Sequence, residues 1–180
     1  DLVMTRFAAN LTLMFTEHAF LDRFAAAADA GFTMVEYMFP YEAAPDRIAA
    51  ALARHKLTQA LFNFPAGDFA KGDRGLAALP ARQAEFDTSI AKALDYAAAA
   101  DCKILNVMAG LGAPGDARAE SAYCDNLKKA CDAAAKNGIT IVIEPINTRD
   151  VPGYFLHDFA KAAAIMAELR AFSSASTGTS

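Results

Sequence analysis

Five short apolar runs in this sequence each end in a carboxylate or carboxamide side chain. These terminal residues are Asn10, Glu36, Asn63, Asn106 and Glu144, and successive members are 26, 27, 43 and 38 residues apart. Such spacings leave room for one helix between each run and the next. The pattern therefore predicts parallel strands alternating with crossover helices, with every polar residue at the carboxyl end of its strand. Parallel α/β proteins carry out their chemistry at that end of the sheet.

The fifth run, residues 139–143, is the clearest predicted strand. Thr140 is its only polar residue, as expected for a strand covered on both faces, and Pro145 ends the run because proline cannot donate to a sheet ladder. Glu144 is consequently held at a rigid rim, where a charge needs a partner, a metal or solvent. An isolated glutamate there would be explained by a salt bridge or a solvated strand end. Five polar residues, each at the carboxyl end of its strand, favour a functional site instead.

Helical signals fill the gaps between the predicted strands. Apolar residues recur at helical spacing, and proline or glycine marks the ends, over residues 20–30, 45–56, 80–100, 116–137 and 157–169. The strands are expected near residues 6–10, 34–38, 58–63, 103–107 and 139–144. Successive strand–helix units predict the α/β class and a (β/α) barrel of the TIM type, with a doubly wound open sheet as the alternative. No GxGxxG turn follows the first run, which weakens a dinucleotide-binding interpretation.

The length predicts an incomplete barrel. A full barrel has eight units and typically about 250 residues, whereas this chain of 180 residues provides five units. We expect one partial barrel domain over residues 1–180. The Ser, Thr, Ala and Gly tract after Arg170 predicts disorder over residues 171–180. Five units leave an open sheet edge and uncovered apolar surface, so a homo-oligomer is expected unless something covers them.

Composition excludes several classes of protein. The chain has 17 basic and 21 acidic residues and a net charge of −4, with no basic cluster that would indicate nucleic acid binding. No signal peptide or bilayer-spanning apolar run is visible, which predicts a cytoplasmic protein without a membrane partner. Three cysteines without a CxxC pair argue against a disulfide framework and predict buried, reduced thiols.

Several other residues are candidates for a site at the strand ends, each with a simpler explanation. Glu36 would orient a substrate, or it would pair with a cation such as Arg6. The three strand-end asparagines would bond substrate hydroxyls or close the strand ends through local backbone bonds. Residues 63–80, rich in Gly, Asp and charge, predict a lid in which Arg74 binds a substrate carboxylate bidentately, although a solvated loop has the same composition.

Four groups of motifs, taken in order, resemble the hydroxypyruvate isomerases, which belong to the xylose isomerase-like group of TIM barrels. The motifs are RFAAN at 6–10, VEYMFPY at 35–41, NFPAGD at 63–68 followed by GDRG at 72–75, and EPIN at 144–147 with PGY at 152–154. The resemblance implies a small hydroxy keto acid substrate, namely hydroxypyruvate converted to tartronate semialdehyde. The alternatives are a 2-oxo-tetronate isomerase, a related sugar epimerase, or an inactive truncated binding fragment.

The chemistry of such an isomerase is a proton transfer through an enediolate. A carboxylate base, a second acid and a divalent ion suit this transfer. The resemblance implies one glutamate on the fifth strand and another on the eighth, both of which also bind Mg²⁺ or Mn²⁺, and Glu144 matches the first. The second glutamate and the ligands of the sixth and seventh strands have no counterpart here. We therefore expect the amino-terminal part of an isomerase, with negligible activity and weak metal binding by these residues alone.

Overall fold

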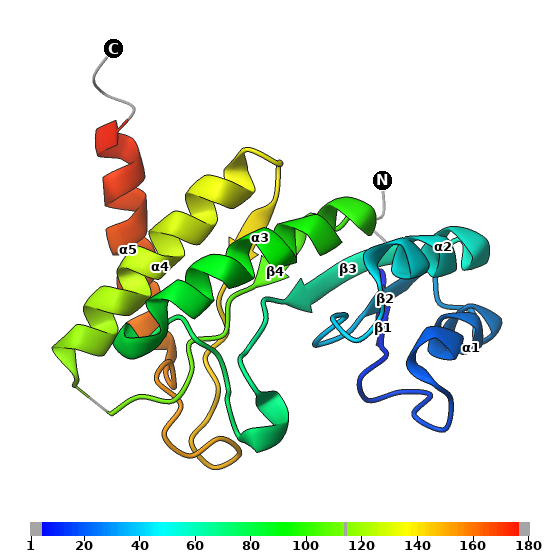
Figure 1. The fold of residues 1–180 in the computed structure, drawn as a ribbon, viewed down its shortest axis with the longest axis horizontal. Helices are drawn as coiled ribbons and strands as arrows, with labels where there is room; N and C mark the ends of the chain where they lie inside the picture. Colours follow the sequence, from blue (N-terminus) through cyan, green and yellow to red (C-terminus); the bar gives the residue numbers. More distant parts are fainter. Residues whose placement is uncertain (1–4, 114, 177–180) are drawn as a thin grey trace.

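The five predicted strands form one parallel sheet. The computed structural model describes residues 5–113 and 115–176. Its strands are β1 (Ala8–Asn10), β2 (Met34–Glu36), β3 (Thr58–Asn63), β4 (Ile104–Asn106) and β5 (Thr140–Val142). They are hydrogen-bonded in chain order, and each neighbouring pair is parallel (Figure 1). The predicted strand positions are confirmed to within two residues, as is the parallel pairing.

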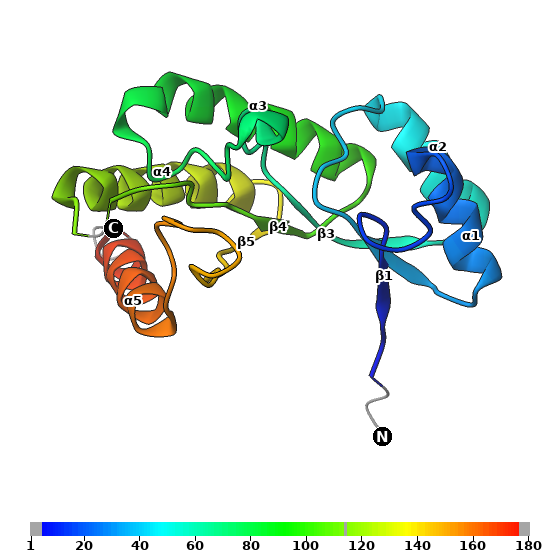
Figure 2. The same cartoon turned by 90° about the horizontal axis from the view of Figure 1, so that it is seen from below.

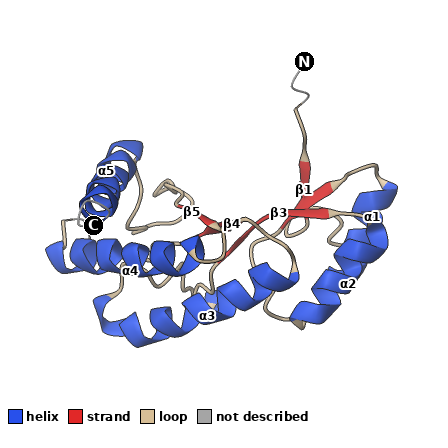
Figure 3. Ribbon diagram, turned by 90° about the horizontal axis from the view of Figure 1, so that it is seen from above, coloured by secondary structure: helices blue, strands red, loops and turns tan. Residues whose placement is uncertain are grey.

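A helix follows each strand, as predicted, and the first four helices connect successive strands. They are α1 (Arg23–Asp29), α2 (Pro45–His55), α3 (Gln83–Ala99), α4 (Ala117–Ala135) and α5 (Phe159–Ser176), with short 3₁₀ turns η1 (Phe20–Asp22), η2 (Phe69–Lys71) and η3 (Pro80–Arg82). Helices α1 to α4 lie along one face of the sheet, and no helix covers the opposite face in the part of the chain that is described (Figures 2 and 3). This arrangement is an arc of a (β/α) barrel, so the predicted fold class is confirmed.

The core lies between the sheet and these four helices. Side chains alternate along each strand, so the middle residue of a short strand faces the helices. Ala9, Val35 and Leu105, at the centres of β1, β2 and β4, are completely buried. Ile104 is the neighbour of Leu105, so its side chain lies on the opposite face of the sheet, the same face as that of the strand-end residues. Ile104 is accordingly 40% exposed. The strand ends therefore project from the face without helices, where a barrel has its interior.

Two expectations differ from the structure. Helix α5 continues through Ser176, so residues 171–176 are helical where disorder was predicted, and residues 177–180 lie outside the described residues. Alanine and serine are tolerated in a helix interior, which explains how the helix passes Arg170. Of the three cysteines, Cys102 and Cys124 are buried as predicted, but Cys131 is exposed. Within residues 5–113 and 115–176, no helix is both long and apolar enough to cross a membrane.

Candidate active site at the carboxyl ends of the strands

The ends of β1 and β2 are joined by a side-chain hydrogen bond. Asn10 and Glu36 are partners in the sheet register, and Asn10 Nδ2 donates to Glu36 Oε1 at 3.1 Å. Asn10 Oδ1 also accepts from the Thr12 amide at 3.0 Å. Asn10 therefore closes its own strand end through a local backbone bond, as one interpretation predicted, and orients the Glu36 carboxylate at the same time.

The ends of β3 and β4 carry a second, more deeply buried pair. Asn63 and Asn106 are register partners with exposed fractions of only 9% and 3%. Asn106 Nδ2 donates to Asn63 Oδ1 at 3.1 Å, whereas Asn106 Oδ1 is buried without a partner among the described residues. A buried acceptor without a donor costs about 1–3 kcal/mol. A ligand or water that donates to Asn106 Oδ1 would remove this cost.

Glu144 lies two residues beyond β5 and is exposed. No hydrogen bond in the described part of the chain joins it to Asn10 and Glu36 or to the two buried asparagines. Among the described residues, the structure thus joins four of the predicted strand-end residues as two hydrogen-bonded pairs and bonds Glu144 to neither pair. That all five open onto one concavity stays a prediction.

Three loops are bonded together beyond the strand ends. They follow β3, β4 and β5, and isolated antiparallel bridges join Gly75 to Ala109 and Leu111 to Tyr154. The Phe155 amide strengthens the second junction by donating to the Gly110 carbonyl at 2.9 Å. Figure 1 shows these loops gathered at the same end of the sheet. Backbone bonds of this kind fix the loops to one another, so residues on them keep defined positions relative to one another.

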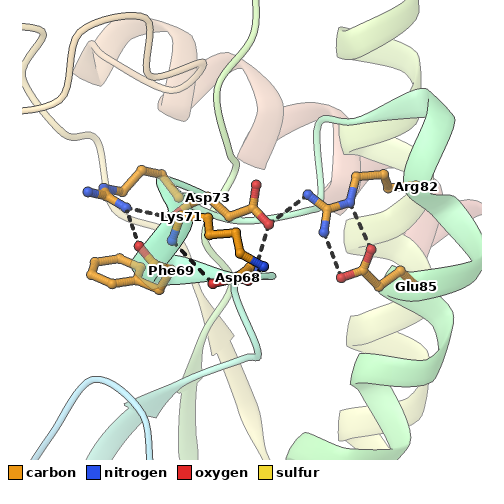
Figure 4. A network of polar contacts seen from close by, with 7 residues as sticks. Asp68, Phe69, Lys71, Asp73, Arg82 and Glu85 are labelled. Carbon is orange, nitrogen blue, oxygen red and sulfur yellow. Dashed lines mark hydrogen bonds and ion pairs between the residues drawn. The ribbon is translucent and has the colours of Figure 1, made fainter.

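The loop predicted as a lid contains a network of charged residues (Figure 4). Asp73 Oδ2 accepts from Arg82 Nη1 at 2.8 Å and from the Asp68 amide at 2.6 Å. Arg82 also donates to both oxygens of Glu85 at 2.7 and 2.8 Å. The hydrogen bond from Arg82 is the largest effect that lowers the pKa of Asp73. This network attaches the loop to the start of α3, and the sequence pattern did not predict it.

Arg74 is held within the same loop. Its Nη1 donates to the carbonyls of Phe69 and Asp73 at 3.1 and 2.7 Å, and its Cζ lies 4.1 Å from the centre of the Phe69 ring. Among the described residues, these bonds all start from Nη1 of the guanidinium. Binding of a substrate carboxylate by Arg74 stays a prediction, because these contacts fix the guanidinium without showing a ligand.

The described residues do not fit a complete metal site. A magnesium ion requires an octahedral set of oxygen ligands, of which carboxylates supply the charge. Within the described ranges, no group of three or more His, Cys, Asp or Glu side chains is placed to hold a metal ion. Glu144 by itself provides too few ligands for such an ion, and the carboxylate of Glu36 already accepts a hydrogen bond from Asn10.

Comparison with known proteins identifies the family. The family model described as xylose isomerase-like TIM barrel matches residues 24–173. The chain belongs to this family. A 2-oxo-tetronate isomerase from Cupriavidus necator is 54% identical over 171 residues, which make up 93% of this chain and 65% of that protein. A hydroxypyruvate isomerase from Escherichia coli is 41% identical over 155 residues, or 85% of this chain and 60% of that protein.

Solved structures agree with this assignment to the xylose isomerase-like family. An AP endonuclease of family 2 from Brucella melitensis superposes with a TM-score of 0.89 at 46% identity, covering 92% of this chain and 65% of that one. A D-allulose 3-epimerase from Methylomonas sp. has a TM-score of 0.62 at 21% identity over 83% of this chain and 52% of that chain, which supports the fold alone. The chain therefore spans less than two thirds of the length of these relatives.

Proposed function

We propose that the whole protein to which these residues belong is an isomerase of small hydroxy keto acids. The observation that carries the proposal is Glu144, which follows β5 within the EPIN motif of a chain that is 54% identical to a 2-oxo-tetronate isomerase. A second relative with that name is 45% identical, and the hydroxypyruvate isomerase is 41% identical. These identities favour 2-oxo-tetronate over hydroxypyruvate as the substrate, although hydroxypyruvate is the substrate predicted from the sequence motifs.

Glu144 would act as the base of the reaction. In the proposed step, its carboxylate takes a proton from the carbon next to the substrate carbonyl, and the electrons of that C–H bond form the double bond of an enediolate. The electrons of the carbonyl double bond move to the carbonyl oxygen, which takes up a proton. Return of the abstracted proton to the former carbonyl carbon, with loss of the proton from the original hydroxyl group, completes the exchange of carbonyl and hydroxyl. Glu144 is exposed just beyond the end of β5, so a ligand can reach its side chain, as this role requires. The second acid would come from outside the described residues.

The other strand-end groups would bind the substrate. Asn106 Oδ1 is a buried acceptor that receives no hydrogen bond from the described residues, so it would favour a ligand hydroxyl. Asn63 would hold Asn106 in place through the 3.1 Å bond between their side chains. Asn10 and Glu36 would present a hydrogen-bonded carboxylate to a further hydroxyl. Arg74 would contribute positive charge toward the substrate carboxylate from its anchored position over Phe69.

A divalent ion is part of the proposal for the whole protein only. Glu144 would supply one of its oxygen ligands, and such an ion stabilises negative charge on substrate oxygens when bound. The test is calorimetric titration of the whole protein and its Glu144→Gln variant with Mg²⁺ and Mn²⁺. Weaker binding by the variant would support the assignment, and equal binding would refute it.

Turnover of the two acids by the whole protein tests the function. We expect isomerisation of 2-oxo-tetronate with a kcat/KM higher than that for hydroxypyruvate, measured by NMR of the substrate mixture. A reversed preference would identify a hydroxypyruvate isomerase and refute our ranking. Activity on ketohexoses alone would identify an epimerase. Binding of both acids without turnover would indicate a noncatalytic binding protein and overturn the proposal.

A further inference from the structure

Met108 is the last member of a row of hydrogen bonds that runs through the two buried asparagines. Its sulfur accepts a hydrogen bond from Asn63 Nδ2 at 3.5 Å, and Asn63 Oδ1 accepts from Asn106 Nδ2 at 3.1 Å. All three residues are buried. They lie at or just beyond the ends of β3 and β4, which are neighbours in the sheet (Figure 1). The asparagine pair therefore has a third partner, on the loop after β4.

The sulfur determines the direction of this row. An asparagine amide has a donor end and an acceptor end, which a half-turn of the side chain exchanges, whereas a thioether sulfur can only accept. The sulfur therefore selects the donor end of Asn63, and this turns Asn63 Oδ1 toward Asn106. Asn106 must then donate, so its own oxygen is the end that is left over. That oxygen is the atom that receives no hydrogen bond from the described residues.

The backbone is held on both sides of Met108. The preceding amide, that of Val107, donates to the Val142 carbonyl of β5 at 3.0 Å. The following residue, Ala109, is joined to Gly75 by an antiparallel bridge. With both neighbours attached to other segments, Met108 keeps its place, and its sulfur is a fixed acceptor at the strand ends.

We propose that Met108 is a positioning residue that determines which substrate group the site accepts. It acts through the two asparagines, by keeping Asn106 Oδ1 as the free end of the row. An oxygen there pairs with the proton of a substrate hydroxyl and repels a carboxylate oxygen, which has no proton to donate. This inference rests on the proposed isomerase function and narrows its substrate class. The site selects acids whose far end is a hydroxymethyl group over acids whose far end is a second carboxylate.

Met108→Leu removes the acceptor and nearly keeps the size of the side chain, a change that packed cores usually tolerate. Without the sulfur, the row can reverse, so that Asn63 Nδ2 donates to Asn106 Oδ1 and the Asn106 amide nitrogen becomes the free end. Both directions keep one bond between the asparagines, and the variant should populate both. A free nitrogen donates to a carboxylate, and a hydroxyl pairs with either end. The variant should therefore bind dicarboxylates better and hydroxymethyl acids about equally well.

The test is calorimetric binding of two probes to the whole protein. Tetronate ends in a hydroxymethyl group and tartrate in a second carboxylate, and neither has a carbonyl group to isomerise. We expect the affinity for tartrate relative to tetronate to rise roughly two- to fivefold in Met108→Leu, because one neutral hydrogen bond no longer opposes reversal. Met34→Leu is the matched control. Met34 is a half-buried residue at the start of β2, and its sulfur makes no hydrogen bond with the described residues.

The control should keep the wild-type ratio of the two affinities. An unchanged ratio in Met108→Leu, or the same rise in Met34→Leu, would overturn the inference. Binding of these probes requires no turnover, so the result stands apart from whether the protein isomerises either keto acid.

NMR of the whole protein tests the row itself. The side-chain amide nitrogen resonances of Asn63 and Asn106 should shift in Met108→Leu and stay in place in Met34→Leu. If Met108→Leu does not fold, the wild type should still show a nuclear Overhauser effect between the Asn63 side-chain amide protons and the Met108 methyl group. Absence of that effect, or unshifted amide resonances in the folded variant, would refute the contact on which the inference depends.

Discussion

Replacing Gly75 by alanine should destabilise the protein by forcing two loops apart. Gly75 has a φ of +123°, a conformation that residues with a side chain rarely adopt. A Cβ built there would collide with the carbonyl oxygen of Met108 and lie 2.6 Å from its carbonyl carbon and 2.7 Å from the Gly110 nitrogen. These are backbone atoms of the loop after β4, so no side-chain rotation can relieve the collision.

Two effects contribute to the expected destabilisation. The strained backbone costs about 1–3 kcal/mol, and forcing extra volume into a packed site costs a further ~1–3 kcal/mol. Together they amount to a large part of the roughly 5–15 kcal/mol by which a native domain is stable. For a protein of this size, the midpoint of thermal unfolding should fall by on the order of 10 °C.

The assay is thermal unfolding of the whole protein, followed by circular dichroism, with Gly72→Ala as the control. Gly72 also has a positive φ, of +105°, but no atom of residues 5–113 and 115–176 lies within 4 Å of the Cβ that alanine would add, apart from those of its chain neighbours. The control therefore contains the backbone strain without the collision. We expect a clearly larger loss for Gly75→Ala than for Gly72→Ala. Equal losses would show that the two loops are not packed as the structure places them.

Two further predictions concern stability. Asn106→Ala should lower the free energy of unfolding in urea by about 1–3 kcal/mol, because the buried Asn63 Oδ1 loses the donor 3.1 Å away; an unchanged value would contradict the buried pair. Asp73→Asn should destabilise the protein at pH 7. Because Arg82 lowers the folded-state pKa of Asp73, this contribution is present above the unfolded pKa of about 3.9 and is lost as pH falls through the lower folded value. The free energies of urea unfolding of the two forms should therefore converge as pH falls below the unfolded pKa and through the lower folded one, and a constant difference would refute the Arg82 bond.

Strand positions could be predicted because apolar runs and their spacing determine them. The lengths of the outer strands could not, because a strand residue also needs a partner. Phe7 was expected in β1, yet the first register pair is Ala8 with Met34, and Phe7 is 72% exposed. Similarly, the helical pattern of α5 continued into a Ser and Ala segment whose composition alone suggested disorder.

For the candidate site, the sequence predicted which residues lie at the strand ends but not which of them bond one another. Polar residues at strand ends were identified, but their pairing depends on register. Glu36 lies opposite Asn10 in the pairing of β1 with β2, and Asn63 lies opposite Asn106 in the pairing of β3 with β4, so each bonds its register partner. No periodic signal in the sequence reveals the register of two strands. The bond between Asp73 and Arg82 was missed for a related reason, since Asp73 lies in a loop nine residues before Arg82 in η3, and this separation follows no helical or strand spacing.

The central claim is that Glu144 removes the substrate proton. Its most direct measurement is the exchange of substrate hydrogen with deuterium from heavy water, followed by NMR in the whole protein and in Glu144→Gln. The substitution keeps the side-chain shape and removes the charge, so unfolding should be little changed. Exchange at the carbon next to the carbonyl should slow roughly a hundredfold to ten-thousandfold, the usual contribution of a general base. Undiminished exchange in folded Glu144→Gln would contradict the account.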